Sequence, residues 1–262
     1  MGAPKELERM TISTINWPAL TNRASTNVTE KKTSNVSKSK KSKSLFTDVD
    51  KKFEENCIKY ILKSKIAEDL NITESSYVQD TDIQKKGVDL IVNYKGKEIK
   101  IDVKSIAEYD FKTFCFELLN SKSGRKGWLF NDELDTDYFL LTYHNVVGGS
   151  GVYSEDKKIL TPENIDKTYA LLIDKNKVKE LVLKELGDID FRIAVYEILT
   201  QSADMSYETP AVFSIENGEL ISKWSPRMRF TISRKIYERP INVVISREEL
   251  RGIAEAEWVI ED

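Results

Sequence analysis

Alternating apolar and polar positions between residues 87 and 105 predict two short strands joined by a turn. Residues 87–93 (GVDLIVN) form a short run rich in β-branched side chains, and residues 98–105 (EIKIDVKS) alternate apolar with polar side chains. Residues 94–97 (YKGK) separate the two runs and supply a turn. This pattern predicts a β-hairpin.

Similar patterns predict the elements around the hairpin. Apolar residues recur at helical spacing from 45 to 61, and a second helix is expected from about 176 to 186. A Ser-x-x-Glu capping box at 246–249 predicts the start of a third helix. Further strands are predicted at 113–119, 137–143, 169–173 and 241–245, with a second hairpin across 211–224 that turns at Asn217-Gly218. These elements indicate an α/β protein.

Three charged residues of the first hairpin indicate chemistry. Because side chains alternate along a strand, Asp102 and Lys104 share one face and Ile101 and Val103 share the other. In an antiparallel hairpin Asp89 can lie close to Asp102, although the pattern leaves the register open. Two neighbouring carboxylates repel each other, and a hard divalent ion such as Mg²⁺ relieves that repulsion through oxygen ligands. The three residues therefore predict a metal site whose bound water is a nucleophile.

Asp89 followed by Asp102-Val103-Lys104 resembles the motif of the PD-(D/E)XK phosphodiesterase superfamily. That superfamily includes restriction endonucleases, junction resolvases and phage or repair nucleases. Val88 stands where the name of the superfamily has proline, a position that is loosely kept among its members. The resemblance implies a restriction-endonuclease-like core, in which a central mixed β-sheet is flanked by helices.

The resemblance also implies an activity and a set of residues. It implies hydrolysis of phosphodiester bonds in DNA, with Asp89 and Asp102 binding Mg²⁺, for which Mn²⁺ is a possible substitute. Lys104 would orient the attacking water or stabilise the transition state. A helix before the sheet often donates a further acid, for which Glu54 is the first candidate and Glu55 the alternative. Residues 79–89 resemble the glutamine-containing lead-in of some bacterial and phage members, and Gln84 would position a water or a phosphate.

The predicted organisation has three parts. Residues 1–46 are rich in Ser, Thr, Asn and Lys, which is typical of a disordered or weakly ordered basic tail. Residues 47–151 would form the nuclease core. Residues 152–262 would continue that core as a C-terminal α/β extension and provide an element for DNA recognition.

Other interpretations of the same residues stay open. Charged residues make up 32% of the chain, so acid-x-lysine triplets also occur by chance, as at 110–112 and 156–158. The hairpin charges could be ordinary solvated charges on a sheet. The chain could also be a catalytically inactive nuclease-like DNA-binding protein, or a protein-interaction module that docks an acidic partner.

Composition excludes several classes of protein. The chain contains no run of eighteen apolar residues and no charged-then-apolar leader, so we expect neither a membrane span nor a secretory signal. Two cysteines are too few for a disulfide framework or a zinc cluster, and they favour the reducing cytoplasm. His144 is the single histidine, which excludes sites built from several histidines and favours a structural role for it.

The net charge of −3 conceals an asymmetry that bears on DNA binding. Residues 1–46 hold nine Lys/Arg and three Asp/Glu, whereas 47–262 hold 31 and 40. Two basic stretches at 121–128 and 223–239 suit a phosphate backbone. The second could instead hold charges on the outer face of a strand, paired with nearby acids. The predicted DNA-binding residues are Lys122, Arg125, Lys126, Arg227, Arg229, Arg234 and Lys235. Cleavage of both strands of a duplex would be easiest for a homodimer.

Overall fold

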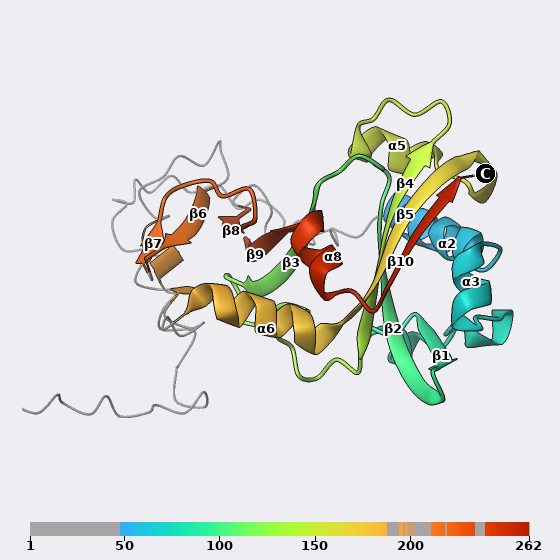
Figure 1. Cartoon of the computed structure of the whole chain (residues 1–262), viewed down its shortest axis with the longest axis horizontal. Helices are drawn as coiled ribbons and strands as arrows, with labels where there is room; N and C mark the ends of the chain where they lie inside the picture. The colour runs from blue at the N-terminus through green and yellow to red at the C-terminus, as the bar shows by residue number, and fades with distance from the viewer. Residues whose placement is uncertain are drawn as a thin grey trace, which may run out of the picture.

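Two β-sheets organise the chain (Figure 1). The structure is a computed structural model, and it describes residues 48–187, 194–195, 197–198, 201, 211–217, 219–233 and 239–261. The first sheet has the order β1-β2-β4-β5-β10 and consists of β1 (Leu90–Tyr94), β2 (Lys97–Ile106), β4 (Tyr138–Val146), β5 (Ile165–Asp174) and β10 (Ala256–Glu261). The second has the order β3-β9-β8-β6-β7 and consists of β3 (Thr113–Asn120), β9 (Pro240–Ser246), β8 (Met228–Ile232), β6 (Ala211–Glu216) and β7 (Glu219–Ile221).

Helices accompany both sheets. In the described part these are α2 (Asp48–Ile61), α3 (Lys65–Leu70), α4 (Thr81–Gln84), α5 (Tyr153–Ile159), α6 (Lys175–Leu186), α8 (Arg247–Ile253) and the short 3-10 helices η2 (Glu74–Ser76) and η3 (Pro162–Asn164). β2 and β4 run parallel and the other neighbours in the first sheet run antiparallel, so that sheet is mixed. The predicted fold class, a mixed sheet flanked by helices, is confirmed. None of the described helices is long and apolar enough to cross a membrane.

The predicted hairpin is formed by β1 and β2. Its turn consists of Lys95 (φ 51°) and Gly96 (φ 79°), and two positive φ angles in a two-residue loop are typical of a type I′ turn. The ladder pairs Leu90 with Ile101, which sets the register that the sequence pattern left open. Residues 102–106 of β2 extend past the first residue of β1. The predicted site lies where this extension begins.

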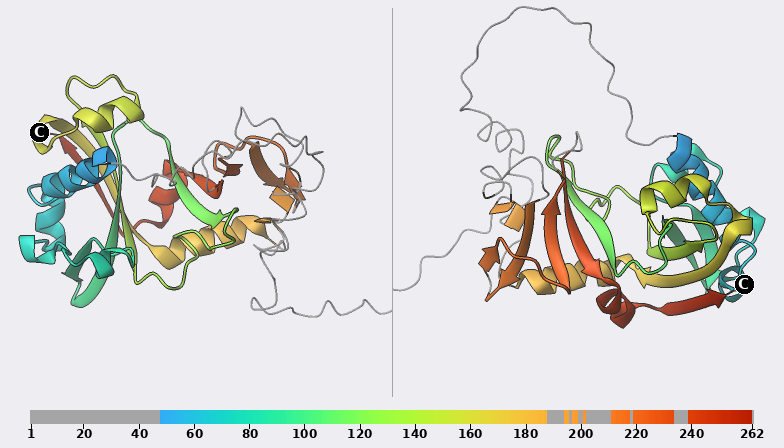
Figure 2. Two further views of the ribbon diagram at one scale, coloured as in Figure 1. Left: turned by 180° about the vertical axis from the view of Figure 1, so that it is seen from behind. Right: turned by 90° about the horizontal axis from the view of Figure 1, so that it is seen from above.

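The two faces of the first sheet pack against different layers. Ile99, Ile101 and Val103 of β2 share a buried apolar cluster with residues of α2 and α3. Figure 1 shows these two helices on the side of the first sheet that faces away from the second sheet, and the views of Figure 2 agree. Asp102 and Lys104 alternate with these apolar residues. They are therefore on the face turned toward the second sheet.

One apolar core joins the two sheets. It contains Phe139 and Leu141 of β4, Phe116 of β3 and Val243 of β9, and Val182 of α6 contributes to it as well. α6 extends from the first sheet toward the second (Figure 1). β3 belongs to the second sheet, whereas β5 and β10 complete the first. Both sheets thus combine strands from either side of residue 151.

Some expectations differ from the structure. The strand predicted at 113–119 is not buried equally on its two faces, because Cys115 is exposed and Glu117 is only half-buried. The reason is that β3 packs on the shared core with one face, through Phe114, Phe116 and Leu118. The strand β10 was not predicted. The proposed basic tail at 1–46 lies outside the described residues.

Candidate active site

Asp89 is the residue just before β1 and lies directly across the hairpin from Asp102. Its backbone N–H donates a hydrogen bond to the Ile101 carbonyl at 2.9 Å, next to the Leu90–Ile101 pair of the ladder. Its carboxylate accepts a hydrogen bond from the Val103 N–H, with 2.8 Å between N and Oδ2. β2 therefore sets both the position and the orientation of this carboxylate.

Asp102 and Lys104 form an ion pair on one face of β2. The distance from Lys104 Nζ to Asp102 Oδ1 is 2.7 Å. Asp102 is only 3% exposed, while the side chain of Lys104 keeps 32% of its surface in contact with solvent. The predicted trio is thus brought together, with a buried carboxylate between a second carboxylate and a lysine that solvent can reach.

The electrostatics of the trio leave an excess of negative charge. Burial raises the pKa of Asp89 to about 7, and the charge of Asp102 adds to this rise, while Lys104 and the Val103 N–H oppose it. Burial by itself lowers the pKa of Lys104, but the charges of Asp102 and Asp89 outweigh burial and raise this pKa, so the ammonium stays protonated. One lysine does not neutralise two close carboxylates. The pair therefore has the charge and the oxygen atoms that suit a hard divalent cation.

Helix α2 brings a third carboxylate toward this pair. Glu54 is exposed along much of its surface, but partial burial raises the pKa of its carboxyl, with the charge of Lys104 lowering and that of Asp102 raising it. Glu54 therefore lies within electrostatic range of both residues. The alternative, Glu55, instead pairs with Lys51 at 3.9 Å on the helix surface.

Gln84 supports the backbone beside Asp89. At the end of α4, its side-chain Nε2 donates to the Val78 carbonyl at 2.8 Å, and its amide also bonds to the Tyr77 hydroxyl. Tyr77 forms a β-bridge with Leu90, and the Val78 N–H donates to the Asp89 carbonyl at 2.9 Å. The structure thus gives Gln84 a contact with the segment that holds Asp89.

Two residues that were not predicted from the sequence, Gly87 and Thr136, lie next to Asp102. Gly87 has φ +76°, and a Cβ at this position would come within 2.7 Å of Thr136 Oγ1 and 3.8 Å of Asp102 Oδ2. The buried Thr136 hydroxyl donates to the Gly87 carbonyl at 2.6 Å. The positive φ explains why a glycine precedes Val88 and Asp89. Thr136 is far away in sequence, and no local pattern marks it.

Trp128 lies beside the lysine of the site. Lys104 Nζ is 5.5 Å from the centroid of the Trp128 ring, in the range of a cation–π contact. The ring is half-buried and packs on Phe116 and Phe139, with centroid distances of 5.1 Å to each. Trp128 therefore connects the lysine to the shared apolar core. The only signal in the sequence is an aromatic residue at the end of a basic, glycine-flanked loop.

The first predicted basic stretch is the loop after β3, which leads to Trp128. Lys122 and Arg125 are exposed on it. Lys126 forms an ion pair with Asp132, with 2.7 Å between Nζ and Oδ2. The loop thus adjoins the site, and Lys126 has an acidic partner on it.

The second predicted basic stretch lies on and around β8 of the second sheet. Arg227 pairs with Glu249, with 2.7 Å between Nε and Oε1. Arg229 lies over the ring of Trp224 at 5.5 Å from its centroid. Lys223 pairs with Glu216. Part of this charge is therefore neutralised locally, as the alternative interpretation expected. The remaining predicted residues of this stretch, Arg234 and Lys235, lie outside the described part.

His144 is fully buried beneath α2. Its two ring nitrogens form hydrogen bonds with the hydroxyls of Thr142 at 2.9 Å and Thr168 at 2.8 Å, and the Tyr60 ring packs edge-on against it. Burial lowers the pKa of the imidazole to about 3, so it is neutral at physiological pH. These contacts agree with the structural role favoured from the sequence.

Within the described residues, no group of three or more His, Cys, Asp or Glu side chains is arranged as a ready metal site. Comparison with protein-family models, curated proteins and solved structures finds no match to this chain. Function is therefore inferred from the geometry of Asp89, Asp102 and Lys104.

Proposed function

We propose that this chain is a metal-dependent nuclease that hydrolyses phosphodiester bonds in DNA, an endonuclease of the restriction, defence or phage type. The observation that supports this most strongly is the hairpin geometry, in which Asp89 stands across from Asp102 and Lys104 Nζ lies 2.7 Å from Asp102 Oδ1. Phosphodiester hydrolysis requires a positioned water and positive charge near the phosphoryl oxygens. A pair of carboxylates beside a protonated lysine can meet both needs.

Each residue of the trio has a distinct task in this proposal. Asp89 and Asp102 would hold Mg²⁺ or Mn²⁺ through their carboxylate oxygens. When bound, the ion would supply Lewis-acid stabilisation and a water of lowered pKa. Asp89 is already oriented by the Val103 N–H, which reduces the reorganisation that binding needs. Lys104 keeps its proton and would orient the attacking water or stabilise negative charge on the phosphate.

Glu54 and Trp128 complete the proposed site from other elements. Glu54 approaches from α2 and adds an acceptor for a proton or a second cation. Trp128 restricts the ammonium of Lys104 through the cation–π contact. We treat Trp128 and Gln84 as positioning residues, since they act through Lys104 and through the backbone of Asp89.

A cleavage assay tests this function directly. Purified protein is incubated with supercoiled, linear, single-stranded and junction DNA, and with RNA, in the presence of Mg²⁺, Mn²⁺ or EDTA. The wild type should nick or cut DNA with either metal and not with EDTA. Asp102→Asn and Lys104→Ala should each reduce the rate by about a hundred-fold or more.

The chain provides a matched control for these variants. Asp110 and Lys112 form another Asp-x-Lys triplet, exposed, with 3.9 Å between carboxylate and ammonium. Asp110→Asn and Lys112→Ala should cleave at the wild-type rate. If Asp102→Asn and Lys104→Ala also cleave at the wild-type rate while remaining folded, the assignment is wrong.

A second candidate is a DNA-binding protein on this scaffold that does not cut. The ion pair between Lys104 and Asp102 favours it to some extent, because a partnered buried carboxylate also has a purely structural use. Under this alternative the protein retards DNA with a steep salt dependence but leaves it intact with Mg²⁺ and Mn²⁺. The third candidate function is a protein-interaction module. Under this alternative the protein does not bind DNA at low salt.

Partners and location follow from the same reasoning. Both Cys57 and Cys115 are free thiols, and we place the protein in the reducing cytoplasm on that ground. A homodimer would bring two sites to the two strands of a duplex. Sedimentation with and without a DNA duplex measures that stoichiometry.

A further inference from the structure

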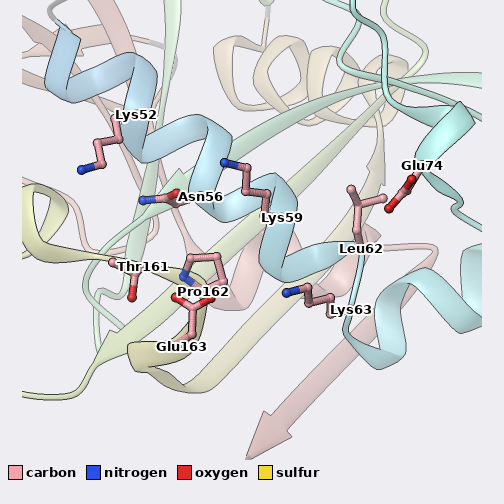
Figure 3. Close-up of a pocket in the computed structure, with 9 residues that line it drawn as sticks. All are labelled: Lys52, Asn56, Lys59, Leu62, Lys63, Glu74, Thr161, Pro162 and Glu163. Carbon is pink, nitrogen blue, oxygen red and sulfur yellow. The ribbon is translucent and has the colours of Figure 1, made fainter.

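A lysine-lined groove runs along α2, away from the candidate active site. It has a volume of about 390 Å³ and lies between α2 and η3. Figure 3 shows Lys52 and Lys59 on the helix and Lys63 just beyond its end, with Thr161 and Glu163 on the facing wall. All three lysines are exposed, so their ammonium groups are accessible from solvent.

The three lysines outnumber the two acids, Glu74 and Glu163, that line the same groove. None of Lys52, Lys59 and Lys63 makes an ion pair with any residue of the part that the structure describes. Many other lysines of the same part do, and Lys157 and Lys177 are examples, at 2.5 Å from Asp50 and 2.6 Å from Glu255. A protein with net charge −3 that leaves adjacent lysines unpaired presents a local attraction for anions.

The spacing of the lysines fits a repeating anion. Lys52 and Lys59 are two helical turns apart and face the same side, about 10 Å along the axis at 1.5 Å per residue. A row of this length can contact more than one phosphate, because a DNA strand carries one phosphate for about each 3.4 Å of helix axis. Lys63 extends the row in the same direction.

The groove is also held rigidly. Asn56 lies on the same side of α2, is buried, and donates from Nδ2 to the Leu160 carbonyl at 2.8 Å. This bond ties the helix to the loop that forms the opposite wall. A helix whose position is fixed in this way loses less conformational entropy on binding than a mobile segment does.

The groove and the carboxylates lie on different sides of α2. At 100° per residue, Glu54 points about 200° away from Lys52 around the helix axis. A nucleic acid in the groove is therefore bound at a place separate from Asp89 and Asp102.

We propose that Lys52, Lys59 and Lys63 form a second contact for the phosphodiester backbone of DNA, remote from the site of cleavage. The inference rests on the proposed function, because it takes the bound strand to belong to the DNA that is cut. The contact is electrostatic and independent of base sequence. It holds the DNA to the protein while the hairpin residues act elsewhere on the same molecule.

Fluorescence anisotropy with a short labelled DNA duplex, in EDTA so that no cleavage occurs, tests the inference. The triple variant Lys52→Gln/Lys59→Gln/Lys63→Gln should bind about tenfold or more weakly at low salt. The slope of log K against log salt should fall in magnitude by about 2 to 3, because each lost phosphate contact removes about 0.9. Lysine and glutamine have similar helix propensities, so α2 should remain intact, and circular dichroism checks this.

Two controls separate the groove from bulk charge. The triple variant Lys65→Gln/Lys97→Gln/Lys184→Gln removes the same charge from exposed positions outside the groove and should keep the wild-type slope to within about 1. Replacing the three groove lysines by arginine should preserve binding. Equal weakening by both glutamine variants, or none by the groove variant, overturns the inference.

Failure of this inference can be told apart from failure of the proposed function. If the wild type cleaves DNA and the groove variant binds normally, the nuclease assignment stands and the groove has no part in binding. If binding depends on the groove lysines and the wild type never cleaves, the groove binds DNA and the nuclease assignment is wrong.

Discussion

Asp89 faces Asp102 across the β1–β2 hairpin, and Lys104 forms an ion pair with Asp102. The two carboxylates repel each other in the folded protein. Burial and the charge of Asp102 together raise the pKa of Asp89 to about 7. Under the proposed function, the same repulsion favours binding of a divalent cation between the two carboxylates. Function and stability should therefore respond in opposite directions when it is removed.

Asp89→Asn should stabilise the metal-free protein, and under the proposed function it should also abolish cleavage. The amide oxygen can still accept the Val103 N–H, and the repulsion with Asp102 disappears. We expect a gain of about 1–2 kcal/mol in the free energy of unfolding in EDTA above neutral pH. Urea denaturation measures this gain, and Asp110→Asn, at an exposed position, should leave stability unchanged. A large loss of stability in Asp89→Asn would contradict this account.

Gly87→Ala should be more costly than Gly96→Ala, although both glycines have φ near +80°. A Cβ at Gly87 would come within 2.7 Å of Thr136 Oγ1, whereas nothing lies within 4 Å of a Cβ at Gly96. We expect about 1 kcal/mol of destabilisation at Gly96 from backbone strain, and about 2–4 kcal/mol at Gly87. Thermal or urea unfolding of the two variants compares them directly. Equal costs would show that Thr136 moves aside freely.

The free energy of unfolding should decrease as the pH falls, because burial keeps His144 neutral in the folded protein. Its pKa is about 3 in the folded protein, below the value of about 6.5 expected in the unfolded chain. Between these values the unfolded state binds a proton that the folded state does not, so stability decreases as pH falls. The contribution approaches about 1.4 kcal/mol per pH unit.

Comparison with His144→Gln isolates this contribution from that of the carboxylates. The variant lacks the titrating imidazole, so its free energy of unfolding should decline less steeply over the same acidic range. Urea titrations at a series of pH values measure both slopes. Parallel slopes would mean that the folded protein accepts a proton at His144.

Tyr143→Phe should preserve or increase stability. The Tyr143 hydroxyl is buried in the shared core and, among the described residues, has no hydrogen-bond partner. Removing a buried polar group that makes no hydrogen bond relieves a desolvation cost of about 1–3 kcal/mol, part of which the variant should recover. Tyr169→Phe is a useful comparison, because its hydroxyl donates to Glu257 at 3.0 Å and its loss should destabilise. A destabilised Tyr143→Phe variant would show that this hydroxyl has a partner in solution.

Local periodicity accounts for the part of the site that could be predicted. The alternation along β2 places Asp102 and Lys104 on one face, and Lys95-Gly96 permits the tight turn that puts Asp89 opposite. The helical spacing of α2 likewise indicated which side of it is buried. These features depend on neighbours a few residues apart, which is why the pattern is sufficient for them.

The remaining features depend on contacts between distant segments. Thr136 and Trp128 come to the site from the loop between β3 and β4, and no spacing rule connects them to Asp102 or Lys104. β10 was missed because its edge position, with Val259 exposed and acids at both ends, weakens the alternating pattern of a strand.

The sequence by itself determined the hairpin, the shared face of Asp102 and Lys104, and the α/β class, because backbone geometry imposes the periods of strands and helices on the chain. Only the tertiary structure decided that β3 leaves the first sheet, that Glu54 approaches the carboxylates, and that a row of lysines on α2 stays unpaired in the described part. Those outcomes follow from which apolar faces bury one another, and burial is a property of the whole folded chain.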